Sequence, residues 1–163
     1  MKVKIRKATL KDVPVIVRMW KEFMGYHKDM VKRNPKIKPY LTEKKNSSHF
    51  FTKYLKSDFK SSNSVVFIAE VEGRPVGYSI NLIRKNPLVY EVEKLGYVSD
   101  LFVKKEFRGM KISSMFRDES IKWFRKKGIK HMSVEVIGGN TYAHSIYKKW
   151  GFFDYKVEMR KKI

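Results

Sequence analysis

The sequence predicts a mixed α/β domain built around one central sheet, and two observations support this class. Runs of alternating apolar and polar residues are interspersed with runs that have apolar residues at helical spacing, in the order β-α-α-β-β-β-α-β-α-β. Within that order, "SVVFIAEVEGRPVGYSINLI" is a β-hairpin pattern with its turn near Gly73, so we expect antiparallel neighbours there. No repeat or linker divides the chain, and we expect a single domain over residues 1–163.

Short local signals predict the first elements. "KVKIRKA" alternates apolar residues with lysines, which is typical of a strand. In "TLKD", Thr9 and Asp12 have the spacing of a capping box. Because Pro14 fits only the first turn of a helix, the helix that follows starts at Thr9 or at Asp12. Residues 31–62 are polar and rich in lysine, and we expect a second helix there, after a mobile segment around the two prolines.

The later elements alternate strand and helix. A strand around residues 95–103 leads through "FRGMKISS" into a helix with one apolar face, which ends at Gly128. "HMSVEVI" predicts the next strand, and "GGN" ends it. Asn140 is a good N-cap for the helix "TYAHSIYKKW", which ends at Gly151. The alternation in "FFDYKVEM" predicts a final strand.

Composition limits the possible partners and the compartment. The 37 basic and 16 acidic residues give a net charge of +21. This charge indicates either an acidic partner, such as nucleic acid or an anionic cofactor, or a compositional bias, since the lysines are spread over every segment. It weighs against a small polycation as substrate. The absence of cysteine, of a signal-peptide pattern and of a long apolar run leads us to expect a soluble cytoplasmic protein.

Several common sites are absent from the sequence. There is no P-loop pattern and no G-x-G-x-x-G dinucleotide fingerprint. The four histidines show no metal-ligand spacing, and we expect no metal. There is no cysteine nucleophile, and no nucleophile elbow marks a serine one. The chemistry therefore has to come from other segments.

The loop "FRGMKISS", from Phe107 to Ser114, joins a strand to a helix. Unpaired backbone N–H groups at a helix N-terminus attract anions, and Arg108 and Lys111 add positive charge. From these residues alone, an anion site and an ordinary basic turn are equally compatible with the loop. On the next helix, Tyr147 is either a phenolic acid or a core residue.

Two segments in this order resemble a known family. "VKKEFRGMKIS" followed by "NTYAHSIYKKWGF" resembles the signature segments of the GNAT superfamily of acyl-CoA N-acyltransferases. The opening "IRKATLKDVPVIVRM" and the hairpin resemble its early elements, so the resemblance covers nearly the whole chain except residues 31–62. It implies the GNAT fold, in which helices flank a mixed, mostly antiparallel and splayed central sheet. It also implies direct transfer of an acetyl group from acetyl-CoA to a primary amine in a ternary complex.

The resemblance implies a role for each matching position. The backbone of the splayed strand would pair with the pantetheine arm, the loop would bind the pyrophosphate, and the asparagine would hydrogen-bond near the pantetheine. Tyr147 would protonate the leaving thiolate of CoA. The implied cofactor-binding residues are Leu101, Phe102, Val103, Arg108, Gly109, Met110, Lys111, Ile112, Ser113, Ser114 and Asn140.

The loop departs from the family pattern at two positions. Lys111 and Ser113 stand where the family has glycine and glycine or alanine. A lysine forced to positive φ would cost on the order of 1 kcal/mol. Alternatively, Lys111 adopts an ordinary conformation and places its ammonium group on a phosphate.

The general base and the acceptor are open at this stage. Polyamine acetyltransferases of the family carry a glutamate where this chain has Ser99, next to Asp100. Glu135 in "VEV" matches a glutamate of the ribosomal-protein N-terminal acetyltransferases, so either Glu135, through a water, or bulk solvent takes the amine proton. The acceptor is a protein N-terminus or lysine, or else a small amine. The alternative is a non-catalytic acyl-CoA- or nucleic-acid-binding protein; we expect a monomer or homodimer and no membrane partner.

Overall fold

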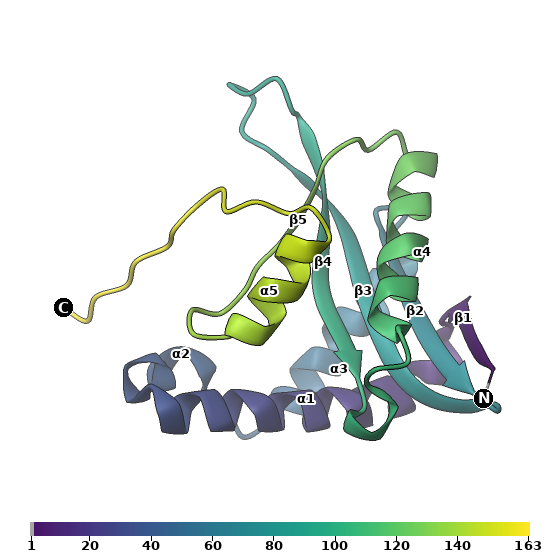
Figure 1. The fold of residues 1–163 in the computed structure, drawn as a ribbon, viewed down its shortest axis with the longest axis horizontal. Helices are drawn as coiled ribbons and strands as arrows, with labels where there is room; N and C mark the ends of the chain where they lie inside the picture. Colours follow the sequence, from purple (N-terminus) through teal and green to yellow (C-terminus); the bar gives the residue numbers. More distant parts are fainter. Residues whose placement is uncertain (1) are drawn as a thin grey trace.

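A single five-stranded sheet forms the centre of the molecule, in a computed structural model that describes residues 2–163 (Figure 1). Its strands, in spatial order, are β1 (Val3–Lys7), β2 (Ser64–Val71), β3 (Arg74–Lys85), β4 (Lys94–Val103) and β5 (Met132–Val134). The first four are antiparallel to their neighbours, and β5 is parallel to β4. The mixed, mostly antiparallel sheet predicted from the sequence is confirmed.

Helices cover both faces of the sheet. They are η1 (Leu10–Asp12), α1 (Val13–Arg33), η2 (Pro35–Ile37), α2 (Lys38–Leu41), α3 (Ser47–Lys60), η3 (Lys105–Phe107), α4 (Ile112–Lys126) and α5 (Thr141–Lys149). In Figure 1, α1 and α3 lie on one side of the sheet and α4 on the other. Each side has its own hydrophobic cluster, which we call the α1–α3 face and the α4 face.

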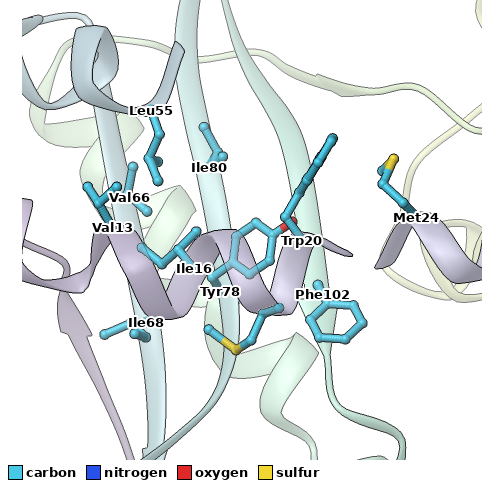
Figure 2. Packing of buried hydrophobic residues seen from close by; sticks show 11 residues of the cluster. Val13, Ile16, Trp20, Met24, Leu55, Val66, Ile68, Tyr78, Ile80 and Phe102 are labelled. Atoms are coloured by element: carbon cyan, nitrogen blue, oxygen red, sulfur yellow. The ribbon is translucent and has the colours of Figure 1, made fainter. Parts of the chain in front are cut away.

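The α1–α3 face is packed mainly by aromatic and branched side chains. Ile16 of α1, Leu55 of α3 and Tyr78 of β3 are all fully buried in the same cluster (Figure 2). Trp20 stacks on Phe51, with the ring centroids 4.5 Å apart, and this contact joins α1 to α3. The helical spacing of the apolar residues in α1 is what turns them all toward the sheet.

The α4 face depends on a close approach of helix and strand. A Cβ atom on Gly96 of β4 would lie 2.8 Å from the ring of Phe124. Glycine at this position therefore lets Phe124 pack directly on the strand backbone. The helix ends where predicted, because Gly128 adopts a φ of +74° just after it.

The start of α1 resolves one choice left open by the sequence. The helix begins at Val13 with Asp12 at its N-cap, and Thr9 caps the preceding turn η1 instead. The carboxylate of Asp12 accepts a hydrogen bond from the backbone N–H of Thr9 at 2.7 Å. Pro14 lies in the first turn of α1, where its missing N–H is not needed.

Three other predictions differ from the structure. No helix was predicted around Pro35, but the segment forms the two short helices η2 and α2 before α3. "HMSVEVI" contributes only Met132–Val134 to the sheet.

The predicted final strand "FFDYKVEM" is wrong: within residues 2–163 no strand follows α5, and the side chains from Phe153 to Met159 are exposed. Asp154 pairs with His144 at 2.7 Å and with Lys148 at 3.2 Å, so the start of this segment contacts α5. The segment then leads away from the sheet (Figure 1).

Candidate active site

The sheet opens between β4 and β5. The two strands pair from Gly96 to Val98 on β4, and beyond this stretch no strand among residues 2–163 pairs with β4 on that side. Lys104 donates its N–H to Val76 on the β3 side at 2.9 Å. Because successive residues of a strand direct their backbone groups to opposite sides, Leu101 and Val103 direct theirs toward the opening.

The predicted pantetheine strand is thus brought to the opening, although its three residues differ in position. The carbonyl of Val103 accepts a hydrogen bond from Arg108 Nε at 3.2 Å. Phe102 belongs to the β3–β4 ladder, and its side chain is buried in the α1–α3 face. The backbone of Leu101 and the N–H of Val103 are therefore the groups best placed to bind a ligand in the opening.

The loop before α4 presents a helix N-terminus. The first helical hydrogen bond runs from the N–H of Met115 to the carbonyl of Lys111, at 3.1 Å. The N–H groups of Ile112, Ser113 and Ser114 therefore have no partner within the helix, and they are available for an anion. Gly109, which precedes them in the loop, adopts a φ of +84°.

Lys111 stands where the resembled family has a glycine, and its backbone adopts a conformation that is typical of glycine. Its φ of 60° and ψ of 16° lie in the left-handed region, so the ordinary conformation that we considered for it is wrong. The chain has to turn here to enter α4, and this turn requires left-handed backbone dihedrals at position 111, whichever side chain is present. The strain is retained although a glycine would remove it.

Two contacts hold the side chain of Arg108 in place. In addition to the hydrogen bond to Val103, its guanidinium lies over the ring of Tyr26 of α1, 4.6 Å from the centroid. Met110 packs at the edge of the α4-face cluster. These contacts fix the loop between the open strand and the start of α4, where an anionic ligand would meet it.

Tyr147 lies on the other side of the opening, on α5. It borders a small cavity of about 10 Å³ together with Leu101, which is 46 positions earlier. Trp150 and Phe152 pack edge-on to its ring at 5.5 Å and 5.7 Å. Burial raises the pKa of the phenol, so Tyr147 is protonated at neutral pH and can act as an acid. The asparagine at the start of α5 caps the helix as predicted, since Asn140 Oδ1 accepts from the N–H of Ala143 at 3.2 Å.

Glu135 follows directly after β5. Its side chain is 75% exposed and pairs with Arg84 Nη1 at 3.3 Å. Arg84 also lies over the ring of Tyr97, 3.2 Å from the centroid. Tyr97 is opposite Leu82, which packs on the α1–α3 cluster, so this group lies on the α1–α3 face.

Asp100 is a residue to which the sequence analysis gave no role. Its carboxylate accepts a hydrogen bond from the hydroxyl of Tyr78 at 3.3 Å. Burial raises the pKa of Asp100 to about 6, and the charge of Asp58 on α3 adds to the increase. A charged residue inside the apolar run "YVSDLFV" was the signal that could have identified it.

The candidate site therefore has two sides. The loop before α4, Leu101 and Tyr147 belong to the α4 face, whereas Asp100 and Glu135 lie on the α1–α3 face. The gap between β4 and β5 joins the two sides.

This arrangement of a splayed sheet beside an anion-accepting helix start is that of an acetyltransferase. The chain belongs to the acetyltransferase (GNAT) family, whose model matches residues 28–152. None of the helices within residues 2–163 is long and apolar enough to cross a membrane. The same residues contain no group of three or more histidine, aspartate or glutamate side chains that could hold a metal ion.

Curated proteins and solved structures of similar chains extend this comparison. An uncharacterized N-acetyltransferase of Methanocaldococcus jannaschii is 26% identical over 94% of the chain, which spans only 62% of that relative's length. An N-alpha-acetyltransferase of Sulfurisphaera tokodaii is 28% identical, covering 94% of this chain and 82% of the relative. A crystal structure of a predicted acetyltransferase with acetyl-CoA, from Clostridium acetobutylicum, has a TM-score of 0.75 at 17% identity, over 99% of this chain and 96% of the other.

Proposed function

We propose that this protein transfers the acetyl group of acetyl-CoA to the amine of a protein N-terminus. The observation that carries the proposal is the opening beside Leu101 and Val103, which lies next to the free N–H groups at the start of α4. A thioester cofactor with a pyrophosphate needs both features, an extended edge for its amide arm and an anion site at its end. The absence of cysteine fits a reducing compartment such as the cytoplasm.

Acetyl-CoA would enter from the α4 face. Its pyrophosphate would accept hydrogen bonds from the N–H groups of Ile112, Ser113 and Ser114, with the charges of Arg108 and Lys111 nearby. The pantetheine amides would pair with the backbone of Leu101 and Val103. This pairing would bring the thioester to the gap between the two faces.

The reaction is a direct transfer between two bound substrates. The amine nitrogen attacks the thioester carbonyl carbon and loses a proton to a base on the α1–α3 face, and the C–S bond breaks. The thiolate of CoA then takes the phenolic proton of Tyr147, which burial keeps in place until that step. Strand N–H groups at the opening would stabilise the carbonyl oxygen as charge develops on it.

The acceptor follows from charge and similarity together. A polycationic small amine would be repelled by a chain of net charge +21. The Sulfurisphaera tokodaii relative, which is an N-alpha-acetyltransferase, supports a protein N-terminus. A lysine side chain or an uncharged small amine is the second candidate.

The test begins with calorimetric titration of the protein with acetyl-CoA, for which we expect micromolar affinity. Transfer is then measured with two peptides, one with a free N-terminus and no lysine, the other with a blocked N-terminus and one lysine. Only the first should be acetylated. Binding of acetyl-CoA without transfer to either peptide or to small amines would instead support a non-catalytic acyl-CoA-binding protein.

Tyr147→Phe separates catalysis from binding. We expect kcat to fall about 10- to 100-fold, because the thiolate loses its acid, while the affinity for acetyl-CoA is unchanged. Tyr142→Phe is the matched control, since Tyr142 is on the same helix but is 69% exposed. Equal rates for the two variants would remove Tyr147 from the mechanism. If nucleic acid binds instead, its affinity should fall steeply with added salt.

A further inference from the structure

A bulge in β4 sets the direction of Asp100. Asp100 is opposite Ile80 while Val98 is opposite Asn81, so Ser99 is an extra residue in this strand. The bulge comes directly after the last residue of β4 that pairs with β5, where the sheet opens. It turns the carboxylate to the α1–α3 face one residue before Leu101, whose backbone faces the opening.

The surroundings of Asp100 leave its charge without a cation. Within residues 2–163, its side-chain partner is the hydroxyl of Tyr78, and no lysine or arginine forms an ion pair with it. Asp58 of α3 contributes a second negative charge. On α1, Glu22 is engaged with Lys104 at 3.9 Å. An unpaired carboxylate with one partly exposed side is a natural place for an ammonium group.

Glu135, on the same face, differs from Asp100 in both exposure and pairing. It is 75% exposed and has Arg84 as its partner at 3.3 Å. The charge of Glu135 is therefore already matched by a guanidinium at the surface. Asp100 is partly enclosed and lacks such a partner, and burial raises its pKa above the usual value of an aspartate.

We propose that Asp100 binds the acceptor amine at the opening and receives its proton during acetyl transfer, with Tyr78 and Asp58 as positioning residues. The proposal rests on the proposed function. The ammonium group of the acceptor first pairs with the carboxylate of Asp100. One N–H proton passes to that carboxylate, the nitrogen lone pair attacks the thioester carbon, the C–S bond breaks, and the thiolate leaves with the proton of Tyr147. The acylated nitrogen loses its second proton to solvent, and Tyr147 regains a proton from solvent. Asp100 then releases its proton to solvent.

The decisive experiment compares Asp100→Asn with Glu135→Gln, two changes that remove a charge and retain the shape. We expect kcat/KM for the acceptor peptide to fall about 100-fold or more in Asp100→Asn and less than about 3-fold in Glu135→Gln. The affinity for acetyl-CoA, measured by calorimetry, should be unchanged in both variants. A large loss in Glu135→Gln together with an active Asp100→Asn would overturn the proposal.

Two further variants test Asp100 through its neighbours while leaving it in place. The acidic limb of the wild-type kcat/KM profile should lie near pH 6, the pKa of Asp100 in the free enzyme. Asp58→Asn removes a like charge and should move this limb to lower pH by about half a unit. Tyr78→Phe removes a hydrogen bond to the carboxylate and should move it to higher pH.

The outcomes separate this proposal from the proposed function. If the wild-type protein transfers acetyl groups but the acidic limb of the kcat/KM profile does not move in Asp58→Asn or Tyr78→Phe, the role of Asp100 alone is refuted. A wild-type protein that binds acetyl-CoA but transfers nothing would sink both. Thermal melts of each variant show whether a lost rate reflects unfolding, and the shifted limbs are read only from active protein.

Discussion

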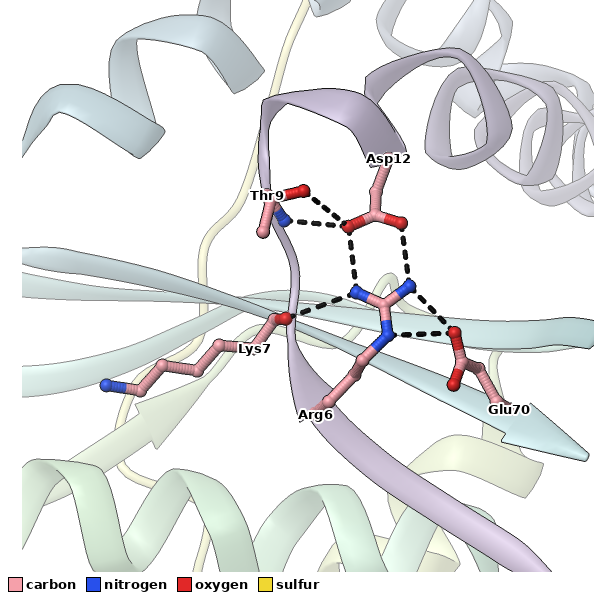
Figure 3. Close-up of polar contacts among 5 residues, drawn as sticks. All are labelled: Arg6, Lys7, Thr9, Asp12 and Glu70. Carbon is pink, nitrogen blue, oxygen red and sulfur yellow. Dashed lines mark hydrogen bonds and ion pairs between the residues drawn. The ribbon is translucent and has the colours of Figure 1, made fainter. Parts of the chain in front are cut away.

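Two enclosed aspartates of this protein are treated in opposite ways. Asp12, at the start of α1, receives two hydrogen bonds from Arg6 at 2.8 Å and 2.9 Å, and these lower its pKa to about 2 (Figure 3). Asp100, in β4, has only the hydroxyl of Tyr78, and burial raises its pKa to about 6. The first arrangement stabilises the fold, whereas the second destabilises it at neutral pH. The difference indicates which carboxylate is retained for chemistry.

The arrangement around Asp12 joins three parts of the chain. Arg6 of β1 also donates to Glu70 of β2 at 2.8 Å, so one guanidinium ties the edge strand to its neighbour and to the first helix. Asp12 in turn accepts from Thr9. Figure 3 shows the guanidinium between the two carboxylates. A bidentate pair of this kind is among the stronger ion pairs in proteins.

The largest effect is expected from removing the paired aspartate. Asp12→Ala should lower the free energy of unfolding at pH 7 by about 3 kcal/mol, because Arg6 and Thr9 lose their shared partner. Denaturant unfolding measures the change. Asp29→Ala is the control, since Asp29 forms an exposed i,i+3 pair with Lys32, and it should change stability by less than about 0.5 kcal/mol. Equal losses would mean that the Asp12 pair contributes no more than a surface pair.

The opposite sign is expected for the unpaired aspartate. Asp100→Asn should raise the free energy of unfolding at pH 8 by about 1 to 2 kcal/mol, because a charge is no longer buried. At pH 4 the gain should be absent, since the wild-type carboxyl is then protonated. A gain that does not depend on pH would show that the charge is not its cause.

The two aspartates also predict opposite slopes of stability against pH. The folded-state pKa of Asp12 is below its unfolded value, so its contribution is present above about pH 4 and is lost as the pH falls through about 2. Asp100 and Asp58 both have pKa values raised to about 6, so stability is lost as the pH rises from about 4 through 6. The unfolding free energy measured between pH 2 and pH 7 should flatten on the acidic side in Asp12→Asn and on the neutral side in Asp58→Asn.

Lys111 extends the comparison from charge to backbone strain. Lys111→Gly should stabilise the protein by about 1 kcal/mol, because φ is already 60° and glycine adopts it without a steric penalty. The affinity for acetyl-CoA should fall in the same variant if the lysine is retained for its ammonium group. Lys111→Asn is a matched control, since asparagine tolerates this conformation but carries no charge. A loss of stability in both variants would show that the backbone at Lys111 is not strained.

The sequence predicted the parts of this comparison that depend on local spacing. The capping-box spacing identified Asp12, and the family glycine pattern identified the position at which Lys111 takes positive φ. The partner of Asp12 was not predictable, because Arg6 also bridges to a residue 64 positions away. Asp100 was missed because a bulge decides which face its side chain takes. The final strand was predicted wrongly because alternation shows a tendency to form a strand and does not supply a partner.

The smallest effect on stability is expected at Glu135, whose side chain is exposed and paired with Arg84 at the surface. Glu135→Gln removes an exposed contact with Arg84, so the free energy of unfolding should change by less than about 0.5 kcal/mol at any pH between 5 and 8. The matched change is Arg84→Gln, which removes the same contact from the other side together with a cation–π contact on Tyr97 at 3.2 Å. We expect that variant to lose about 1 kcal/mol, because the ring is buried and the guanidinium covers it. If Glu135→Gln lost as much unfolding free energy as Arg84→Gln, this surface carboxylate would stabilise the fold as Asp12 does. Pairing with a cation would then not distinguish the carboxylates that stabilise the fold from the one retained for chemistry on this face.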